Sequence, residues 1–366
     1  MSSLEICSLT AAVLHQHFPA AQIVTLPIAD GGEGSVEAIL SSLGGRLIDC
    51  TVQGPYGEEM LCRYGIVADG RTAVIEMASC AGLPLVGERR HPGKTTTYGV
   101  GQQIADAVML HGCRRVILGL GGSATNDLGC GAAAALGVVF RTRDGSAFIP
   151  TGETLSQISR IETNGLLAEL AATEIIAICD IDNPLYGSQG AAYIFGPQKG
   201  ADPAMVAFLD KQLRAASEVI YHDLGIDIAD LPGAGAAGGM GGGMVAFLGA
   251  KLQMGIETIL DMVSFAEIAK DADLILTGEG KLDQQSLRGK VVVGVGRRAK
   301  ALGVPVIAIV GDIADGMEAI YVEGITAVMS INRIATSLER ARLRSRSDLT
   351  STIDTLCRVL KISNSL

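Results

Sequence analysis

A glycine-rich segment at residues 121–127, Gly-Gly-Ser-Ala-Thr-Asn-Asp, carries side chains suited to phosphate chemistry. It follows an apolar run, where a strand is expected to end and a helix to begin. Glycine lets backbone amides approach an anion, and a helix N-terminus adds partial positive charge. Ser123, Thr125 and Asn126 can donate hydrogen bonds to phosphate or carboxylate, whereas Asp127 suits a metal ion or an attacking hydroxyl. The alternative is a structural strand–helix turn, because short glycine motifs are weakly specific.

A second glycine-rich segment, residues 277–283, has the sequence Thr-Gly-Glu-Gly-Lys-Leu-Asp and is followed by Lys290. Acidic side chains beside lysines suit a metal–nucleotide complex, because phosphate attracts cations and the metal needs carboxylates. The alternative is a solvated, charged loop. From the two segments, the candidate phosphate or ATP ligands are Gly121, Gly122, Ser123, Thr125, Asn126, Gly278, Glu279, Gly280 and Lys281.

Three further acids lie within or after apolar runs. Asp180 and Asp182 come after the run 174–179, and in a strand residues i and i+2 share one face. Magnesium in kinases is commonly held by one or two carboxylates together with phosphate oxygens. The alternative is that these acids cap the turn before Pro184, and we expect one of the two to do only that. Glu76 instead lies within the apolar run 74–77 and is either a buried functional acid or a solvent-facing side chain.

Two more polar loops contain candidate substrate ligands. Residues 30–34 read Asp-Gly-Gly-Glu-Gly, and residues 196–200 read Gly-Pro-Gln-Lys-Gly. Lys199 could hold a carboxylate or a phosphate, or it could be an exposed lysine in a turn. The five histidines lie outside all of these loops, which disfavours triad hydrolysis and a histidine-based zinc site. No Gly-x-Gly-x-x-Gly fingerprint with an acid about 20 residues on is present, which disfavours a dinucleotide fold.

Strand and helix patterns alternate around these loops. Apolar runs predict strands at 22–28, 115–120, 174–179, 273–276, 305–310 and 325–330, and turn signals predict β structure over 46–77. Helical patterns occupy 36–43 (with Ser35 as N-cap), 131–136 and 291–302, and a further amphipathic helix follows residues 97–101 and reaches Leu110. This alternation predicts an α/β protein with a parallel sheet, whose ligands bind at the carboxyl ends of the strands.

Composition excludes several classes of protein. The net charge is −10, Trp is absent and no basic stripe is visible, which argues against a nucleic-acid partner. No signal peptide is recognised, and the uncharged stretch 231–250 contains eight glycines, so we interpret it as a loop and helix of a soluble, cytoplasmic protein with no membrane partner. Eight scattered cysteines without a CxxC pair favour reduced core thiols over a metal site.

The loops, taken together and in order, resemble the bacterial type I glycerate kinase family, and the resemblance covers nearly the whole chain. The matching segments are Ala-Asp-Gly-Gly-Glu-Gly-Ser at 29–35, Val-Ile-Glu-Met-Ala at 74–78, Thr-Thr-Tyr-Gly-Val-Gly at 96–101, residues 121–127, Cys-Asp-Ile-Asp-Asn-Pro-Leu at 179–185, Phe-Gly-Pro-Gln-Lys-Gly-Ala at 195–201, Ala-Ala-Gly-Gly-Met-Gly at 236–241, Thr-Gly-Glu-Gly at 277–280 and Gly-Lys at 289–290.

The resemblance implies transfer of the ATP γ-phosphoryl group to a hydroxyl of D-glycerate. It implies 2-phosphoglycerate as the product, with 3-phosphoglycerate as the alternative, and ATP and Mg²⁺ as cofactors. It also implies two α/β domains with the active site in the cleft between them. The Rossmann-like domain is built from residues 1–50 and 258–366, and the inserted mixed α/β domain covers 51–257. A homo-oligomer is compatible with this assignment.

Residue chemistry at the matching positions suggests individual roles. Phosphoryl transfer depends on positioning and charge neutralisation more than on covalent chemistry. The expected catalytic residues are Asp180, as base or metal ligand, with Asp127 and Lys290. The expected substrate ligands are Asp30, Glu33, Lys199 and Asn183, and the expected metal ligands are Asp180 and Glu279.

The chain departs from the family pattern at three places. Lys281 stands where the family usually has arginine, and Val292 where it has proline. The chain also begins after the family's first strand and Asp-Ser-Phe-Lys loop, so we expect that strand of the Rossmann-like sheet to be missing and activity to be weakened. One alternative is therefore a non-catalytic or weakly active binder of glycerate or nucleotide. An NAD-dependent dehydrogenase is the less favoured alternative, because the fingerprint is absent.

Overall fold

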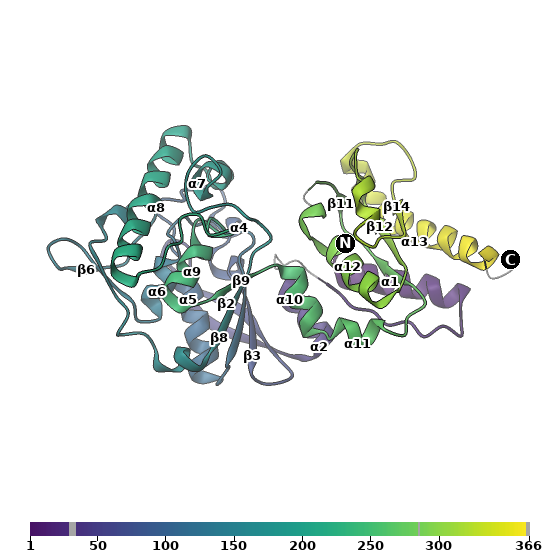
Figure 1. Ribbon diagram of the computed structural model, residues 1–366, viewed down its shortest axis with the longest axis horizontal. Coiled ribbons are helices and arrows are strands. Elements are labelled where there is room, and N and C mark those ends of the chain that lie inside the picture. Colours follow the sequence, from purple (N-terminus) through teal and green to yellow (C-terminus); the bar gives the residue numbers. More distant parts are fainter. Residues whose placement is uncertain (29–33, 285, 364–366) are drawn as a thin grey trace. The chain divides into compact units, whose positions relative to one another are not determined.

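The computed structural model describes residues 1–28, 34–284 and 286–363, and the chain divides into two compact units (Figure 1). Unit 1 comprises Met1–Asp30 with Ile256–Leu366, and unit 2 comprises Gly31–Gly255. The first boundary lies earlier than the expected 50/51. The reason is that strand β1 (Gly45–Gln53) pairs over its whole length with β2 (Glu59–Val67), which ties this part of the chain to the sheet of unit 2.

Unit 2 contains a six-stranded sheet in the order β1-β2-β3-β4-β8-β9. The first two strands form an antiparallel hairpin, and β2 pairs antiparallel with β3. The other four strands run parallel; they are β3 (Thr72–Glu76), β4 (Arg115–Gly119), β8 (Glu174–Ile178) and β9 (Lys251–Gln253). The predicted strands at 115–120 and 174–179 and the β structure over 46–77 are confirmed. Four of the five residues of β4, and of β8, are buried, as expected for strands covered on both faces.

Helices cover the sheet of unit 2 and build a second core beside it. They are α2 (Ser35–Leu43), α3 (Ala78–Ala81), α4 (Leu83–Val86), α5 (Tyr98–Ala105) with a π-helical extension (Asp106–Leu110), α6 (Cys130–Ala135), α7 (Ala191–Phe195), α8 (Pro203–Leu224) and α9 (Met240–Leu248). A small antiparallel sheet is formed by β5 (Val139–Arg141), β6 (Ala147–Phe148) and β7 (Arg160–Glu162). Ser35 was expected to cap α2, but the N-cap is Gly34 and Ser35 is the first helical residue.

Unit 1 has a three-stranded parallel sheet in the order β10-β12-β14. Its strands are β10 (Ile275–Thr277), β12 (Val306–Val310) and β14 (Ala327–Ser330), and the short β11 (Lys281–Leu282) pairs with β13 (Asp312–Ile313). Its helices are α1 (Ser3–His17), α10 (Gly255–Met262), α11 (Phe265–Ala269), α12 (Val291–Leu302) and α13 (Leu338–Ser363). The three predicted strands and the helix at 291–302 are confirmed.

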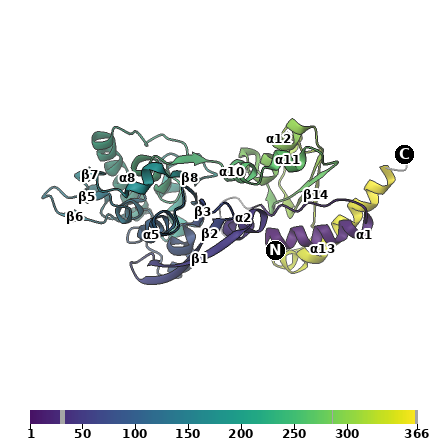
Figure 2. The ribbon, with the colours of Figure 1, turned by 90° about the horizontal axis from the view of Figure 1, so that it is seen from below.

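The two ends of the chain meet within unit 1, where α1 lies beside α13 (Figures 1 and 2). Val13 of α1 is buried in one cluster with Leu349, Ile353 and Cys357 of α13. The predicted strand at 22–28 is wrong, because this segment is irregular. Val24 is exposed, and Pro27 has no N–H to donate to a sheet.

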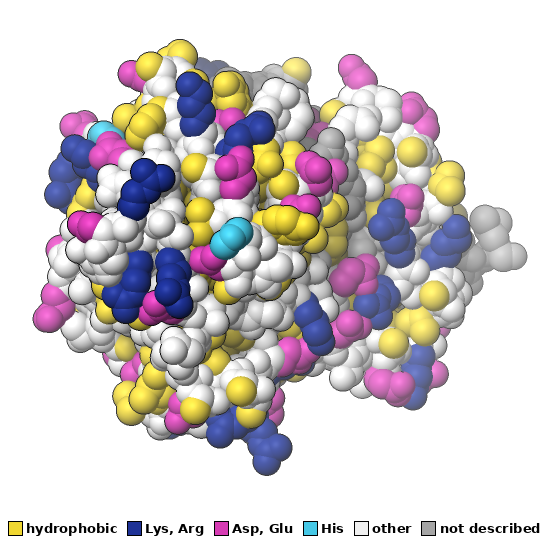
Figure 3. Space-filling model, turned by 60° about the vertical axis from the view of Figure 1, so that its left-hand side comes forward, with side chains coloured by type: hydrophobic (Ala, Val, Ile, Leu, Met, Phe, Trp, Pro, Cys, Tyr) yellow, Lys and Arg dark blue, Asp and Glu magenta, His cyan; other side chains and the backbone are white. Residues whose placement is uncertain are grey.

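Surface and core agree with the compositional expectations. On the face shown in Figure 3, basic and acidic side chains are interspersed rather than gathered by sign. All eight cysteines are free thiols, and all but Cys7 are buried. Within residues 1–28, 34–284 and 286–363, no helix has both the length and the apolar character that crossing a bilayer requires.

Candidate active site

The parallel strands of unit 2 end in one row, and the polar segments singled out from the sequence follow it directly. Glu76, Gly119, Ile178 and Gln253 are neighbours in the register of β3, β4, β8 and β9. Because the carboxyl ends of parallel strands meet at one edge of a sheet, Glu76, the loop 121–127 and Asp180 share that edge. The sequence therefore predicted both the loops and the edge at which they meet.

The loop 121–127 is held by backbone contacts on both sides. Ser123 forms an isolated β-bridge with Gly82, and the Ala124 N–H donates to the Ala81 carbonyl at 2.9 Å. The Thr95 hydroxyl donates to the Ala124 carbonyl, also at 2.9 Å. Gly122 has φ +73°, in the left-handed region that favours glycine. The loop is thus a rigid feature with a defined backbone shape.

Asp127 closes this loop and is fully buried. Its Oδ2 accepts hydrogen bonds from the Thr97 N–H and hydroxyl, both at 2.8 Å, and from the Gly131 N–H at 3.3 Å. Its Oδ1 accepts from the Gly129 N–H at 3.2 Å. Burial raises the pKa of Asp127, and the hydrogen bonds from Thr97, Gly129 and Gly131 oppose that rise. With four donors around it, this carboxylate holds the loop to the start of α5 and α6.

The glycine-rich segment before α9 packs directly onto the same loop. A Cβ at Gly238, where φ is +68°, would lie 2.0 Å from the Thr125 carbonyl oxygen, and a Cβ at Gly243 would lie 1.8 Å from that of Leu128. Leu128 and Ala237 both have positive φ, at 57° and 53°, although they carry side chains. Such strain persists only where the surroundings enforce it, and it gathers at functional sites. The uncharged, glycine-rich stretch 231–250 therefore packs closely against the loop.

Lys199 reaches the loop from the 3₁₀ turn Pro197–Lys199 and is 2% exposed. Its Nζ donates to the Ser123 hydroxyl and to the Thr125 carbonyl, both at 2.7 Å. Burial lowers the pKa of Lys199 to about 7, and the negative charge of Asp127 opposes that shift. The alternative of an exposed lysine in a turn is therefore wrong.

Other polar atoms of the loop are buried without a partner. Within the described parts of the chain, the Thr125 hydroxyl and both amide atoms of the Asn126 side chain make no hydrogen bond. Such atoms are rare in native proteins and call for an explanation such as a ligand or a water molecule. These residues were expected to contact phosphate on the basis of residue type alone.

The remaining candidates of unit 2 lie in turns at the same edge. Asp180 is half-buried, and its Oδ1 accepts from the Gly255 N–H at 2.8 Å. Asp182 is exposed. The expectation that Asp180 and Asp182 share one face of a strand is wrong, because strand β8 ends at Ile178, before either residue. Asn183 donates from Nδ2 to the Gln189 carbonyl at 2.7 Å.

Glu76 accepts a hydrogen bond from the Val36 N–H at 2.8 Å and so holds the first turn of α2. Burial raises the pKa of Glu76, against the hydrogen bonds from the backbone of α2. The cap residue Gly34 has no side chain to satisfy these N–H groups, so Glu76 takes over the capping role from another element.

The second glycine-rich segment lies in unit 1, between β10 and α12. A Cβ at Gly278 would lie 2.1 Å from the Ile309 carbonyl oxygen, and a Cβ at Gly311 would lie 2.2 Å from that of Gly280. The Gly311 N–H donates to the Glu279 carbonyl at 3.1 Å. Glycine is required here because two loop backbones touch.

The other candidates of unit 1 surround this loop. Lys290 is the N-cap residue of α12, Glu279 is half-buried, and Lys281 is exposed. Asp30 and Glu33 lie outside the described residues.

Sequence reasoning missed two residues that shape the site. Thr97 binds Asp127 with both its N–H and its hydroxyl, and Gly238 allows the segment before α9 to touch the loop. Both lie in segments that had been matched to the family, 96–101 and 236–241. The small and polar residues of these two segments could have drawn attention to Thr97 and Gly238, but only the fold shows what the two residues contact.

These features define an α/β protein with glycine-rich loops at the ends of parallel strands. The family model described as "Glycerate kinase family" matches residues 1–361. The chain belongs to the glycerate kinase family.

Relatives and a solved structure agree with this assignment. A glycerate kinase of Halalkalibacterium halodurans is 44% identical over 324 residues, 88% of this chain and 85% of the relative. A glycerate 2-kinase of Escherichia coli is 42% identical over 342 residues, 93% of this chain and 90% of the relative. A crystal structure from Salmonella typhimurium LT2, described as a candidate glycerate kinase 2, matches with a TM-score of 0.89 at 39% identity and covers 100% of this chain and 96% of its own.

Proposed function

We propose that this protein transfers the γ-phosphoryl group of ATP to a hydroxyl of D-glycerate and that 2-phosphoglycerate is the product. Membership of the family supports the reaction, and the printed name of the E. coli relative, glycerate 2-kinase, supports the position. The structural observation that carries the proposal is the single edge of unit 2 where Glu76, the loop 121–127 and Asp180 follow adjacent parallel strands.

The loop 121–127 would bind anionic oxygens of the substrates. Its backbone shape is fixed by the bridge from Gly82 to Ser123, so its amides need not reorganise when a ligand binds. Asn126 and Thr125 offer buried polar atoms without a partner in the described chain. Asp127 is saturated by four donors, so its proposed role is to hold this loop rather than to contact the reacting hydroxyl.

Asp180 is the proposed carboxylate for the metal or for the glycerate hydroxyl. It lies half-buried just after β8, where ligands of parallel sheets bind. Its Oδ1 is oriented by the Gly255 N–H, which fixes the carboxylate plane. Asn183 and Lys199 would contribute to glycerate binding from the neighbouring turns.

The residues present fit a magnesium ion that arrives with a nucleotide. Among the described residues, no three His, Cys, Asp or Glu side chains form a protein cage for a metal. Mg²⁺ typically needs only one or two carboxylates in kinases, because phosphate oxygens and water supply the rest. When bound, the ion would neutralise charge on the transferring phosphoryl group. Asp180 is the proposed carboxylate of unit 2, and Glu279 is, separately, the metal ligand proposed from the sequence for unit 1.

In unit 1, the proposed nucleotide ligands are the backbone of Gly278–Gly280 and the side chains of Lys281 and Lys290. The backbone there is tightly constrained by its contact with Ile309 and Gly311. Lys290 is the N-cap residue of α12, where a helix N-terminus favours negative charge. Asp30 and Glu33 stay proposals for glycerate binding from sequence only.

The decisive experiment incubates the purified full chain with ATP, Mg²⁺ and D-glycerate and identifies the product by ³¹P and ¹³C NMR. We expect ADP release that depends on both D-glycerate and the metal, with the phosphate on the C2 oxygen. Phosphate on the C3 oxygen would correct the position only. Binding of ATP or glycerate without turnover would instead support the weakly active binder, and NAD-dependent oxidation with no use of ATP would overturn the kinase proposal.

A further inference from the structure

Lys199 is a buried cation whose hydrogen-bond acceptors are neutral. Its Nζ contacts a hydroxyl of Ser123 and a carbonyl of Thr125, and within the described chain no carboxylate lies in ion-pair distance of it. A buried charge without a counter-charge is costly, so such groups are normally paired or lose their charge. Two of the three ammonium protons are donated to the loop, which leaves one for another acceptor.

The charged groups around Lys199 do not supply that acceptor. Asp127 is near enough to influence it, but the carboxylate oxygens of Asp127 are occupied by Thr97, Gly129 and Gly131. Arg90, which lies over the same turn, donates to the Gln198 and Gly87 carbonyls and adds positive charge. No negatively charged group therefore accepts a hydrogen bond from the Lys199 ammonium group in the described chain.

The unpartnered atoms of the loop lie next to the acceptors of Lys199. Thr125 supplies its carbonyl to Lys199, while its hydroxyl and the neighbouring Asn126 amide make no hydrogen bond. Asn126 is 1% exposed and Thr125 is fully buried. Buried polar atoms without a partner destabilise the protein, so a ligand oxygen that reaches them is favoured. One anionic group would satisfy both the orphaned dipoles and the unpaired ammonium.

We propose that Ser123, Thr125, Asn126 and Lys199 form a subsite for an anionic oxygen group, and that Lys199 takes up a proton when this subsite is occupied. The shared chemistry is a carboxylate or phosphate oxygen, supplied either by the hydroxy acid or by the nucleotide. This inference deepens the proposed function, on which it rests for the identity of the two ligands.

The free protein is poised for such uptake. Burial lowers the pKa of Lys199 to about 7, so a fraction of the free protein lacks this proton near neutral pH. An anion beside the ammonium raises that pKa, because an opposite charge favours the charged form. Occupying the subsite should then bind a fraction of a proton near pH 7 and a larger fraction at pH 8. Affinity should weaken by up to about tenfold per pH unit above 7.

The test is isothermal titration calorimetry of the full chain in two buffers with different ionisation enthalpies, at pH 7 and pH 8. One arm titrates D-glycerate and the other titrates ATP with saturating Mg²⁺, because neither ligand titrates in this range. We expect the stated proton uptake in one arm, which identifies the source of the anion. No uptake in either arm would overturn the inference.

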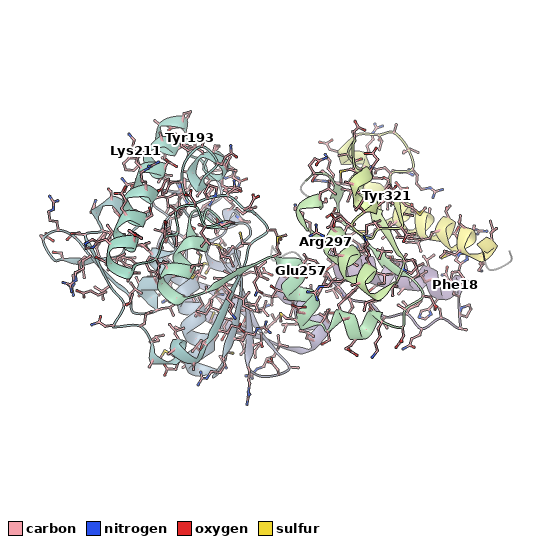
Figure 4. All side chains as sticks on the ribbon, in the orientation of Figure 1. Phe18, Tyr193, Lys211, Glu257, Arg297 and Tyr321 are labelled. Atoms are coloured by element: carbon pink, nitrogen blue, oxygen red, sulfur yellow. The ribbon has the colours of Figure 1, made fainter. Side chains whose placement is uncertain are left out.

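Substitutions at Lys199 distinguish an effect of its charge on ligand binding from an effect on folding. Lys199→Met should abolish the uptake and weaken binding in the same arm at least tenfold, whereas Lys199→Arg should keep more affinity but show no uptake, since arginine stays charged. Lys211→Met is the matched control, because Lys211 projects from the exposed side of α8 (Figure 4). Uptake that persists in Lys199→Met would overturn the assignment of the proton to Lys199.

The outcomes also separate this inference from the proposed function. Wild-type protein that phosphorylates D-glycerate but binds both ligands without proton uptake would refute the subsite alone. Wild-type protein that shows the uptake but no turnover would refute the kinase proposal alone. If Lys199→Met does not fold, the proton count of the wild type still decides.

Discussion

Replacing Asp127 by asparagine tests whether a buried carboxylate, with hydrogen bonds to both of its oxygens, holds the loop 121–127 in place. The substitution keeps the size of the side chain but turns one acceptor atom into a donor. In the native site four donors face the carboxylate, from Thr97, Gly129 and Gly131. At least one of them must then meet an NH₂ group, and the others lose the charge of their acceptor.

The size of the effect follows from those contacts. Hydrogen bonds to a charged group contribute about 1.5–3 kcal/mol and neutral ones about 0.5–1.5 kcal/mol, so each of the four loses about 1 kcal/mol. Removing the desolvation of a buried carboxylate offsets part of this loss, which leaves about 3 kcal/mol of destabilisation. For a unit of the size of Gly31–Gly255, this corresponds to a fall in Tm of about 6–12 °C.

The assay is thermal unfolding of Asp127→Asn followed by circular dichroism, together with glycerate-dependent ADP release. Asp144→Asn is the control, because Asp144 also accepts bonds within a turn, from Thr142 and Ser146, but is exposed. It should change stability by less than about 0.5 kcal/mol. A Tm for Asp127→Asn within about 2 °C of wild type would refute the reasoning, since the magnitude above corresponds to at least three times that shift.

Three further substitutions test other parts of the site. Gly238→Ala should lower the free energy of unfolding in urea by more than about 3 kcal/mol, because its Cβ would lie 2.0 Å from the Thr125 carbonyl oxygen. The control Gly249→Ala has a similar φ but open space around the Cβ, so it should cost about 1 kcal/mol. Equal costs for the two variants would contradict this reasoning. Asp180→Asn should lower turnover about 100-fold or more with the fold intact, while the exposed Asp182→Asn stays near wild type; normal turnover would assign Asp180 to capping only. The pKa of Lys199 is about 7 in the folded protein and about 10.4 in the unfolded chain. Between pH 7 and pH 10 the unfolded chain therefore binds more protons, so the free energy of unfolding should rise by up to about 1.4 kcal/mol per pH unit. Lys199→Met should lack this increment in urea unfolding at pH 7, 8 and 9, and parallel pH profiles would refute it.

Much of the fold could be predicted because its signals are local. The apolar runs at 115–120 and 174–179 are short, continuous and followed by glycine or aspartate, which is typical of buried parallel strands. That pattern also implied that the loops after them meet at one edge, as the register of β4 and β8 confirms. The run at 22–28 shows the limit, because a short apolar run with a proline has no strand identity until a partner strand is present.

The roles of individual site residues depended on contacts between distant parts of the chain. Lys199 meets Ser123 across 76 residues, and Glu76 meets Val36 across 40, and no periodicity or spacing encodes such pairs. Asp127 was expected near a metal ion or an attacking hydroxyl from its charge; the structure adds that it is buried and accepts four hydrogen bonds within its own surroundings.

The sequence by itself therefore determined the order of strands, glycine loops and helices, and the edge at which ligand loops gather, because strand and helix formation depend on neighbouring residues. The tertiary structure alone decided which polar side chains are buried, which are saturated and which lack a partner, as with Asp127 on one side and Asn126 on the other. The physical reason is that desolvation and hydrogen bonding depend on every element packed around a group, whereas sequence pattern reports only the element that carries it.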